Sequence, residues 1–84
     1  MNKGEIREAF LKLVNKVAPD IDPADVSDDD HLQDDLELDS MDILNLVTAL
    51  HETLGVSVSE TDYQNIETTG AAVRFLMEKL QQSA

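Results

Sequence analysis

Three segments of the chain repeat their apolar residues with the period of an α-helix, and this repetition limits the possible folds. Residues 3–17 place apolar side chains at i, i+4, i+7, i+8 and i+11, which lie on one helical face. These residues are Ile6, Phe10, Leu13, Val14 and Val17. Residues 40–54 repeat in the same way, with Leu46 widening a stripe of Ile43, Val47, Leu50 and Leu54. A last helix, capped by Thr68 or Thr69, is expected to run through Leu80 with Ala72, Phe75, Leu76 and Leu80 inward.

The segments between these helices differ from one another in length and composition. Pro19 is expected to end the first helix near Ala18, because the residue before a proline disfavours the helical conformation. Residues 19–38 then form an acidic loop of about 20 residues, which is unusually long for a compact domain. Its scattered aliphatic residues predict that it packs back on the core: Ile21, Val26, Leu32, Leu36 and Leu38.

The second connection is shorter and is expected to contain a little regular structure. Residues 56–58 alternate like a strand but are too few to pair alone, and Gly55 suits the end of the second helix. Residues 60–66 are expected to form a short third helix. The predicted fold class is therefore all-α, a small four-helix bundle with a long first loop and a short third helix.

The length of 84 residues predicts one small domain, expected to be a single free-standing unit over residues 1–84. No apolar run approaches the roughly 20 residues of a membrane span, and the charged N-terminus lacks the pattern of a secretory signal. There is no cysteine, so disulfides, cysteine zinc sites and thiol catalysis by this chain are excluded. A cytoplasmic location is expected.

The formal net charge of −12 restricts the partners that the chain can bind. It argues against nucleic acids and anionic membranes, both of which attract lysine and arginine. It favours partners with basic patches. No lysine or arginine occurs between Lys16 and Arg74. This acidic interval has two interpretations, general solubility or a surface kept acidic for a basic partner, and charge alone does not decide between them.

Ser40 does not fit the pattern of a catalytic serine. A serine nucleophile needs a base within hydrogen-bond reach. His51 is eleven residues further along the same predicted helix, or roughly 16 Å away at 1.5 Å per residue. His31 lies in the long loop, but no G-x-S-x-G turn surrounds the serine. A serine hydrolase is therefore disfavoured.

The aspartates of the long loop do not have the spacing of a calcium site. An EF-hand loop needs oxygen ligands at positions 1, 3 and 5 and glycine at position 6. A loop started at Asp20 has Ala24 at position 5 and Asp25 at position 6, and one started at Asp28 has Leu32 at position 5. No metal site is predicted, although weak divalent binding that relieves repulsion is compatible with the cluster.

The residues that begin the second helix, 36–42, have the sequence Leu-Glu-Leu-Asp-Ser-Met-Asp. One interpretation is ordinary capping, with Asp39 as the N-cap and Asp42 facing the positive end of the helix dipole. A second is a modification site, because a serine on the first turn points outward and the helix N-terminus favours an attached anion. The two interpretations are compatible.

The segment Asp39-Ser40-Met41-Asp42 resembles the Asp-Ser-Leu-Asp core of acyl carrier proteins. The resemblance continues through residues 43–52 and 66–72, and the helix order and acidity fit along the chain. It implies that Ser40 carries 4′-phosphopantetheine, transferred from coenzyme A by a phosphopantetheinyl transferase. The thiol of that arm would hold an acyl group as a thioester, and the chain itself would not be an enzyme.

The same resemblance implies roles for the second helix. Met41 would dock into partner enzymes beside the arm, and Asp39 and Asp42 would meet basic residues of the transferase and of acyl-loading and acyl-transfer enzymes. The implied partner surface comprises Asp39, Met41, Asp42, Asn45, Thr48 and Glu52. An apolar space that shelters the acyl chain would be lined by Leu46, Val47, Leu50 and Ile66, although ordinary core packing also explains these residues. The chain is expected to act as a monomer.

The sequence departs from the family pattern at several positions. Glu37 stands where the family often has glycine, so the turn before Ser40 is expected to differ. Asn45 and His51 occupy positions that are often acidic in the fatty-acid synthesis carriers of the family, and Thr48 stands where a larger apolar residue is typical. These changes suggest a specialised carrier of fatty-acid, lipid or polyketide-type biosynthesis. The alternatives are an aminoacyl, peptidyl or D-alanyl carrier with the same arm, and an acidic interaction domain without an arm.

Overall fold

The computed structural model describes residues 2–82 and is built from three α-helices and two short 3₁₀-helices. Their order is α1 (Lys3–Val17), η1 (Pro23–Asp25), α2 (Ser40–Leu54), η2 (Glu60–Ile66) and α3 (Thr69–Gln82). The described residues form no β-strand, only an isolated antiparallel bridge between His31 and Thr68. The all-α fold class is confirmed, and the short third helix is a 3₁₀-helix. No helix in this part of the chain is long and apolar enough to span a membrane.

Local capping sets the bounds of α1 and α2. At the start of α1, the Asn2 side chain accepts a hydrogen bond from the Glu5 amide at 2.8 Å, and Glu5 accepts one from the Asn2 amide at 3.1 Å. α1 ends at Val17, just before Pro19, as predicted. α2 ends at Leu54 and is followed by the capping residue Gly55, whose φ of 71° lies in the left-handed region that glycine adopts at little cost.

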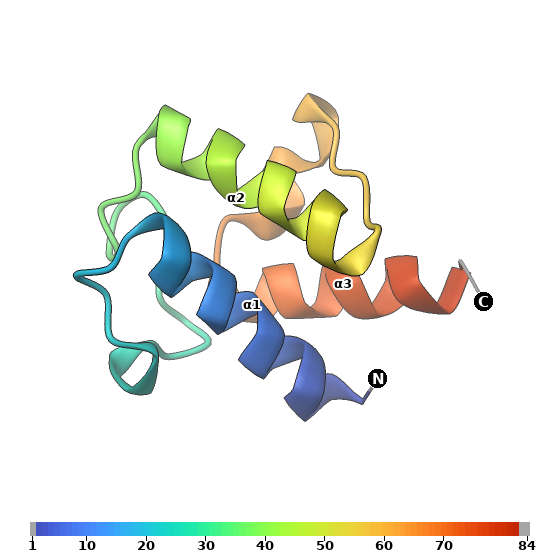
Figure 1. Cartoon of the computed structure of the whole chain (residues 1–84), viewed down its shortest axis with the longest axis horizontal. Coiled ribbons are helices and arrows are strands. Elements are labelled where there is room, and N and C mark those ends of the chain that lie inside the picture. The colour runs from blue at the N-terminus through green and yellow to red at the C-terminus, as the bar shows by residue number, and fades with distance from the viewer. Residues whose placement is uncertain (1, 83–84) are drawn as a thin grey trace.

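The three α-helices surround one apolar core, with α1 packed against both α2 and α3 and η2 packed against α3 (Figure 1). The predicted apolar stripes point into this core, and the sequence pattern missed only residues at their edges, such as Leu11 and Val73. Figure 1 also shows that α2 begins at the end of the molecule opposite to the start of α1 and the end of α3. Ser40, the first residue of α2, therefore lies far from the start of α1 and from the end of α3.

The long loop between α1 and α2 packs back on the core, as its aliphatic residues predicted. Val26, Leu32 and Leu38 are buried, and Ile21 and Leu36 are partly buried against them. The one-turn helix η1 within the loop was not predicted. It forms because the Asp22 side chain accepts a hydrogen bond from the Ala24 amide at 2.9 Å and a proline occupies its first position.

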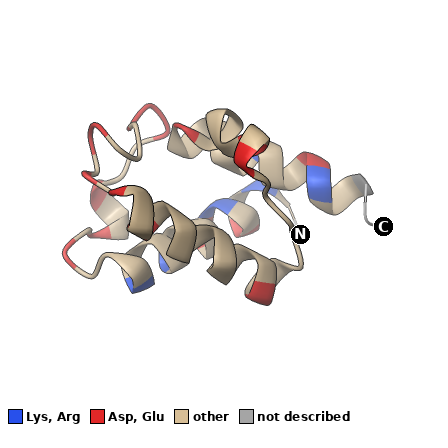
Figure 2. Cartoon of the chain, turned by 90° about the horizontal axis from the view of Figure 1, so that it is seen from above, with Lys and Arg blue, Asp and Glu red and all other residues tan. Residues whose placement is uncertain are grey.

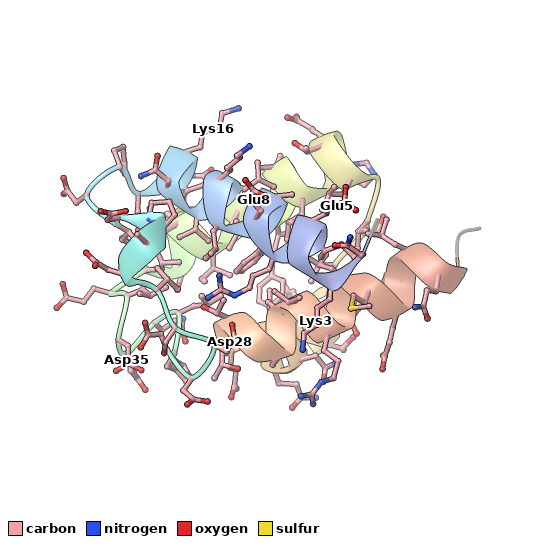
Figure 3. The ribbon with its side chains drawn as sticks, turned by 90° about the horizontal axis from the view of Figure 1, so that it is seen from below. Lys3, Glu5, Glu8, Lys16, Asp28 and Asp35 are labelled. Carbon is pink, nitrogen blue, oxygen red and sulfur yellow. The ribbon has the colours of Figure 1, made fainter. Side chains whose placement is uncertain are left out.

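The loop is held from two sides, by α1 and by the start of α3 (Figure 3). Arg7 donates hydrogen bonds to Asp28 at 2.8 Å and to the Val26 carbonyl at 3.0 Å. On the other side, the Gly70 amide donates to the Asp28 carbonyl at 2.9 Å. A β-carbon at Gly70 would lie only 3.1 Å from that carbonyl oxygen, so a side chain there would push the loop away.

Charge is separated by element. All lysines and arginines lie on α1 and α3, whereas the loop between α1 and α2 carries most of the acidic residues (Figure 2). The acidic end of the molecule is the end at which α2 begins. Ser40 thus lies at the end of the molecule where acidic side chains gather.

Candidate functional site

Ser40 is the first residue of α2, and it is exposed. Asp39, the N-cap, accepts a hydrogen bond from the Asp42 amide at 2.9 Å, and Asp42 accepts one from the Asp39 amide at 3.3 Å. This reciprocal pair fixes the first turn on both sides of the serine. The capping interpretation is therefore correct, and it leaves the Ser40 hydroxyl without a hydrogen-bond partner among residues 2–82.

The first turn of α2 can accommodate a phosphodiester on that hydroxyl. The Ser40 and Met41 amides lie in the first turn of the helix and have no hydrogen-bond acceptor within the described chain. The capping pair engages only the Asp39 and Asp42 amides. Free amides and the positive end of the helix dipole stabilise an anion at this position. The aspartates beside the serine oppose it electrostatically, but their oxygens are already oriented toward backbone amides. The residues present therefore fit a serine-linked phosphopantetheine.

The turn before Ser40 keeps an unusual backbone conformation. Glu37 has a φ of 59°, the one positive φ among the described residues that are not glycine. This is the left-handed region, where a side chain costs energy that glycine would not incur. The next residue, Leu38, is buried and anchors the turn through a 3.0 Å hydrogen bond from its amide to the Leu32 carbonyl. The turn thus holds a glutamate in a backbone conformation that glycine adopts at little cost.

The outward face of α2 presents the residues of the predicted partner surface. Met41, Asn45, Thr48 and Glu52 are all exposed and recur at helical spacing from Ser40 onward. The Thr48 hydroxyl donates to the Leu44 carbonyl at 3.0 Å, so its polar atom is turned to its own helix. Sequence reasoning missed Leu44, which is 48% exposed beside Met41 at 63%. Its position three residues after Met41, outside the buried stripe, was the signal that could have identified it.

A cavity of about 180 Å³ opens between the long loop, α2 and η2. It is lined by Leu32, Ile43, Tyr63 and Ile66, together with His31, Gln33, Gln64 and Glu67. Ile43 lies three residues after Ser40, so the cavity begins within one helical turn of the serine.

Only one of the four predicted pocket residues, Ile66, lines this cavity. Val47 lines a separate, open hollow with Thr48 and His51. Leu46 and Leu50 have no exposed surface and lie in the core, so an acyl chain would reach them only if the core opened. Sequence periodicity could not separate the two cases, because it identifies the buried face of a helix but not the gaps between elements.

The acidic residues of the loop are spread out. Within residues 2–82, no group of three or more histidine, cysteine, aspartate or glutamate side chains is arranged to hold a metal ion. His31 and Asp35 instead stabilise the loop itself, since the Asp35 carboxylate accepts a hydrogen bond from the His31 amide at 2.7 Å. The geometry of the loop therefore depends on backbone contacts.

Comparison with known proteins agrees with this arrangement. The sequence model of the phosphopantetheine attachment site matches residues 6–76. The chain is 32% identical over 76 residues to an acyl carrier protein of Acidothermus cellulolyticus, covering 90% of this chain and 89% of that protein. It is 37% identical over 59 residues to an acyl carrier protein of Solidesulfovibrio magneticus, covering 70% of this chain and 76% of that protein.

The fold has a similar match among solved structures. The acyl carrier protein from Enterococcus faecalis superposes with a TM-score of 0.77 at 30% sequence identity, covering 94% of this chain and 99% of that one. Sequence model, curated relatives and fold agree over nearly the whole chain. The chain belongs to the acyl carrier protein family and is a non-catalytic carrier with covalently attached 4′-phosphopantetheine.

Proposed function

We propose that Ser40 is the attachment residue and that the chain carries acyl groups for enzymes of fatty-acid, lipid or polyketide-type biosynthesis. The observation that carries this proposal is the exposed Ser40 hydroxyl, which has no hydrogen-bond partner among the described residues, on a turn where the Ser40 and Met41 amides also lack an acceptor from these residues. When bound, phosphopantetheine supplies the thiol that holds the cargo, which this chain cannot supply because it has no cysteine. The residues around Ser40 expose the attachment point and present it to partners.

The cavity beside Ile43 and Ile66 is the proposed shelter for the cargo. Its position one turn from Ser40 and its aliphatic floor support this role. Burying a methylene group there contributes up to about 0.8 kcal/mol. Of the remaining predicted pocket residues, Val47 lines a separate hollow, and Leu46 and Leu50 lie in the core. Leu46 and Leu50 would take part only with longer chains that displace core side chains.

The outward face of α2 is the proposed docking surface for the phosphopantetheinyl transferase and for acyl-handling enzymes with basic patches. Met41 and Leu44 offer exposed apolar area, and Asp39 and Asp42 offer negative charge on either side of Ser40. Asn45, Thr48 and Glu52 continue the same face. Because Asn45 and Thr48 are neutral, the face is less acidic than the loop before it. This favours a dedicated set of partner enzymes over a general one.

The first experiment measures the intact mass of the protein after incubation with coenzyme A, magnesium and a broad-specificity phosphopantetheinyl transferase. The natural sequence is expected to gain one phosphopantetheinyl group, and Ser40→Ala is expected to gain none. Ser57→Ala, which alters another exposed serine, is the matched control and should gain one group. If the folded natural protein gains nothing, or if Ser40→Ala gains as much, Ser40 is not the attachment site and an acidic interaction domain becomes the better account.

A further inference from the structure

The cavity beside Ser40 has an apolar floor and a polar rim. The lining residues Leu32, Ile43 and Ile66 are buried and form the floor. His31, from the long loop, and Glu67, the residue after η2, are partly exposed and belong to the rim. A cavity that binds only plain alkyl chains does not need a histidine and a glutamate on its rim. The His31–Glu67 pair therefore indicates which kind of acyl group the cavity suits.

The hydrogen bonds of His31 define which of its ring nitrogens is a donor. The amides of Gln33 and Asp34 both donate to Nδ1, each at 3.3 Å. A nitrogen that accepts hydrogen bonds carries no proton, so the proton of the neutral ring is on Nε2. The Asp34 carboxylate lies 3.8 Å from the same Nδ1, beyond hydrogen-bond distance.

The Nε2–H group faces the Glu67 carboxylate without reaching it. The Nε2 and Oε2 atoms are 3.9 Å apart, which is beyond hydrogen-bond distance. The backbone holds both residues in place, through the bridge between His31 and Thr68 and the 2.8 Å hydrogen bond from the Leu32 amide to the Glu67 carbonyl. The backbone thus places a donor and an acceptor side chain across a gap of 3.9 Å, and one oxygen atom set to the side of that gap can contact both.

We propose that this pair recognises a hydroxyl group on the acyl chain, so that the carrier preferentially shelters hydroxyacyl cargo. The inference rests on the proposed function. A hydroxyl accepts a hydrogen bond from Nε2–H and donates one to the Glu67 carboxylate at the same time. A ketone only accepts, and a methylene does neither. The hydroxyl belongs near the thioester end, at the rim, and the alkyl tail lies on the floor of Leu32, Ile43 and Ile66.

The test uses the full chain loaded at Ser40 with four-carbon acyl groups that differ only at the third carbon. The transferase is supplied with butyryl-, 3-oxobutyryl- or either enantiomer of 3-hydroxybutyryl-coenzyme A, and intact mass confirms loading. The rate of thioester cleavage by hydroxylamine is then measured and divided by the rate for the same acyl group on free pantetheine. One 3-hydroxybutyryl enantiomer is expected to be protected about three- to tenfold more than butyryl, the size of one net hydrogen bond.

Two variants assign the protection to the pair. His31→Asn keeps an acceptor for the Gln33 and Asp34 amides but removes the Nε2 donor, and Glu67→Met removes the carboxylate while leaving the backbone carbonyl in place. Each should abolish the extra protection of the hydroxyacyl form. Glu8→Met, on the exposed surface of α1 (Figure 3), is the control and should retain it.

The outcomes separate the two proposals. Absence of any mass gain contradicts the proposed function and this inference with it. Normal loading with equal protection of butyryl and 3-hydroxybutyryl overturns only the inference, as does extra protection that survives in both His31→Asn and Glu67→Met. A change of the His31 Nε2 nitrogen resonance that appears only in the hydroxyacyl form supports it independently of cleavage rates.

Discussion

At the scale of single residues, two adjacent threonines at the start of α3 have opposite roles. The Thr68 hydroxyl accepts a hydrogen bond from the Ala71 amide at 3.1 Å and caps the helix, whereas Thr69 is fully buried and its hydroxyl has no partner within the described residues. Both were candidates for the cap in the sequence. A cap contributes stability, but a buried hydroxyl without a partner costs its desolvation.

These roles predict opposite effects of the same substitution. Thr68→Val is expected to lower the free energy of unfolding by about 1 kcal/mol, since it removes a cap. Thr69→Val is expected to raise it by about 1 kcal/mol, because a methyl group replaces an unsatisfied hydroxyl of the same shape. Urea denaturation of the two variants and the natural sequence measures both. Destabilisation by Thr69→Val would mean that its hydroxyl has a partner, such as a buried water.

Glu37 supports a second prediction at this scale, through its φ of 59°. Glu37→Asn is expected to raise the free energy of unfolding by about 0.5–1 kcal/mol, since asparagine tolerates the left-handed region and loses less freedom than glycine. Glu37→Gln removes the charge but not the strain and is the control. If thermal denaturation shows equal gains for Asn and Gln, charge repulsion and not backbone strain limits this turn.

At the scale of elements, the long loop depends on its contact with α1. The hydrogen bond from Arg7 to Asp28 holds the pKa of that carboxyl below its usual value of 3.8. Since the folded pKa lies below the unfolded one, the contact contributes stability above about pH 4. That contribution is lost as the pH falls through the folded pKa. Because the pair is half exposed, its size is expected to stay under about 1 kcal/mol.

Asp28→Asn should therefore melt below the natural protein at pH 7 and approach it below about pH 4. Each variant is compared with the natural protein at the same pH, because acid protonates carboxylates throughout the chain and thereby reduces their mutual repulsion. Asp29→Asn removes the same charge from the exposed neighbouring residue and is the matched control. Calorimetry across pH 3 to 7 gives both differences. A gap between Asp28→Asn and the control that stays constant across this range would contradict the assigned role of Arg7.

At the scale of elements, the ends of the helices could be predicted from the sequence, whereas the cavity could not. The end of α1 and both ends of α2 follow from local signals such as Pro19, Asp39 and Gly55, so they could be predicted closely. The position of Ser40 on the first turn of α2, next to the Asp39 cap, could be predicted from local sequence in the same way. The cavity is not, because it arises where the loop, α2 and η2 meet, and no spacing within one element encodes that meeting. His31 and Glu67 could be found only once the fold brought them together.

At the scale of the whole molecule, the net charge of −12 opposes folding through self-repulsion. The melting temperature is expected to rise with sodium chloride between 10 and 200 mM, in the range where screening between surface charges changes most. Millimolar magnesium or calcium should raise it further by binding diffusely to the acidic loop. Thermal scans in the two series measure this. A melting temperature that is flat in both would show that the loop is not under electrostatic strain.

The restriction of lysine and arginine to α1 and α3 also determines where trypsin, which cleaves after these two residues, cuts the chain. The last site on α1 is Lys16 and the first on α3 is Arg74. Complete digestion of the unfolded chain therefore leaves residues 17–74 as one fragment, which contains the loop, all of α2, η2 and the whole rim of the cavity. Ser40, with any group attached to it, is always found on that fragment.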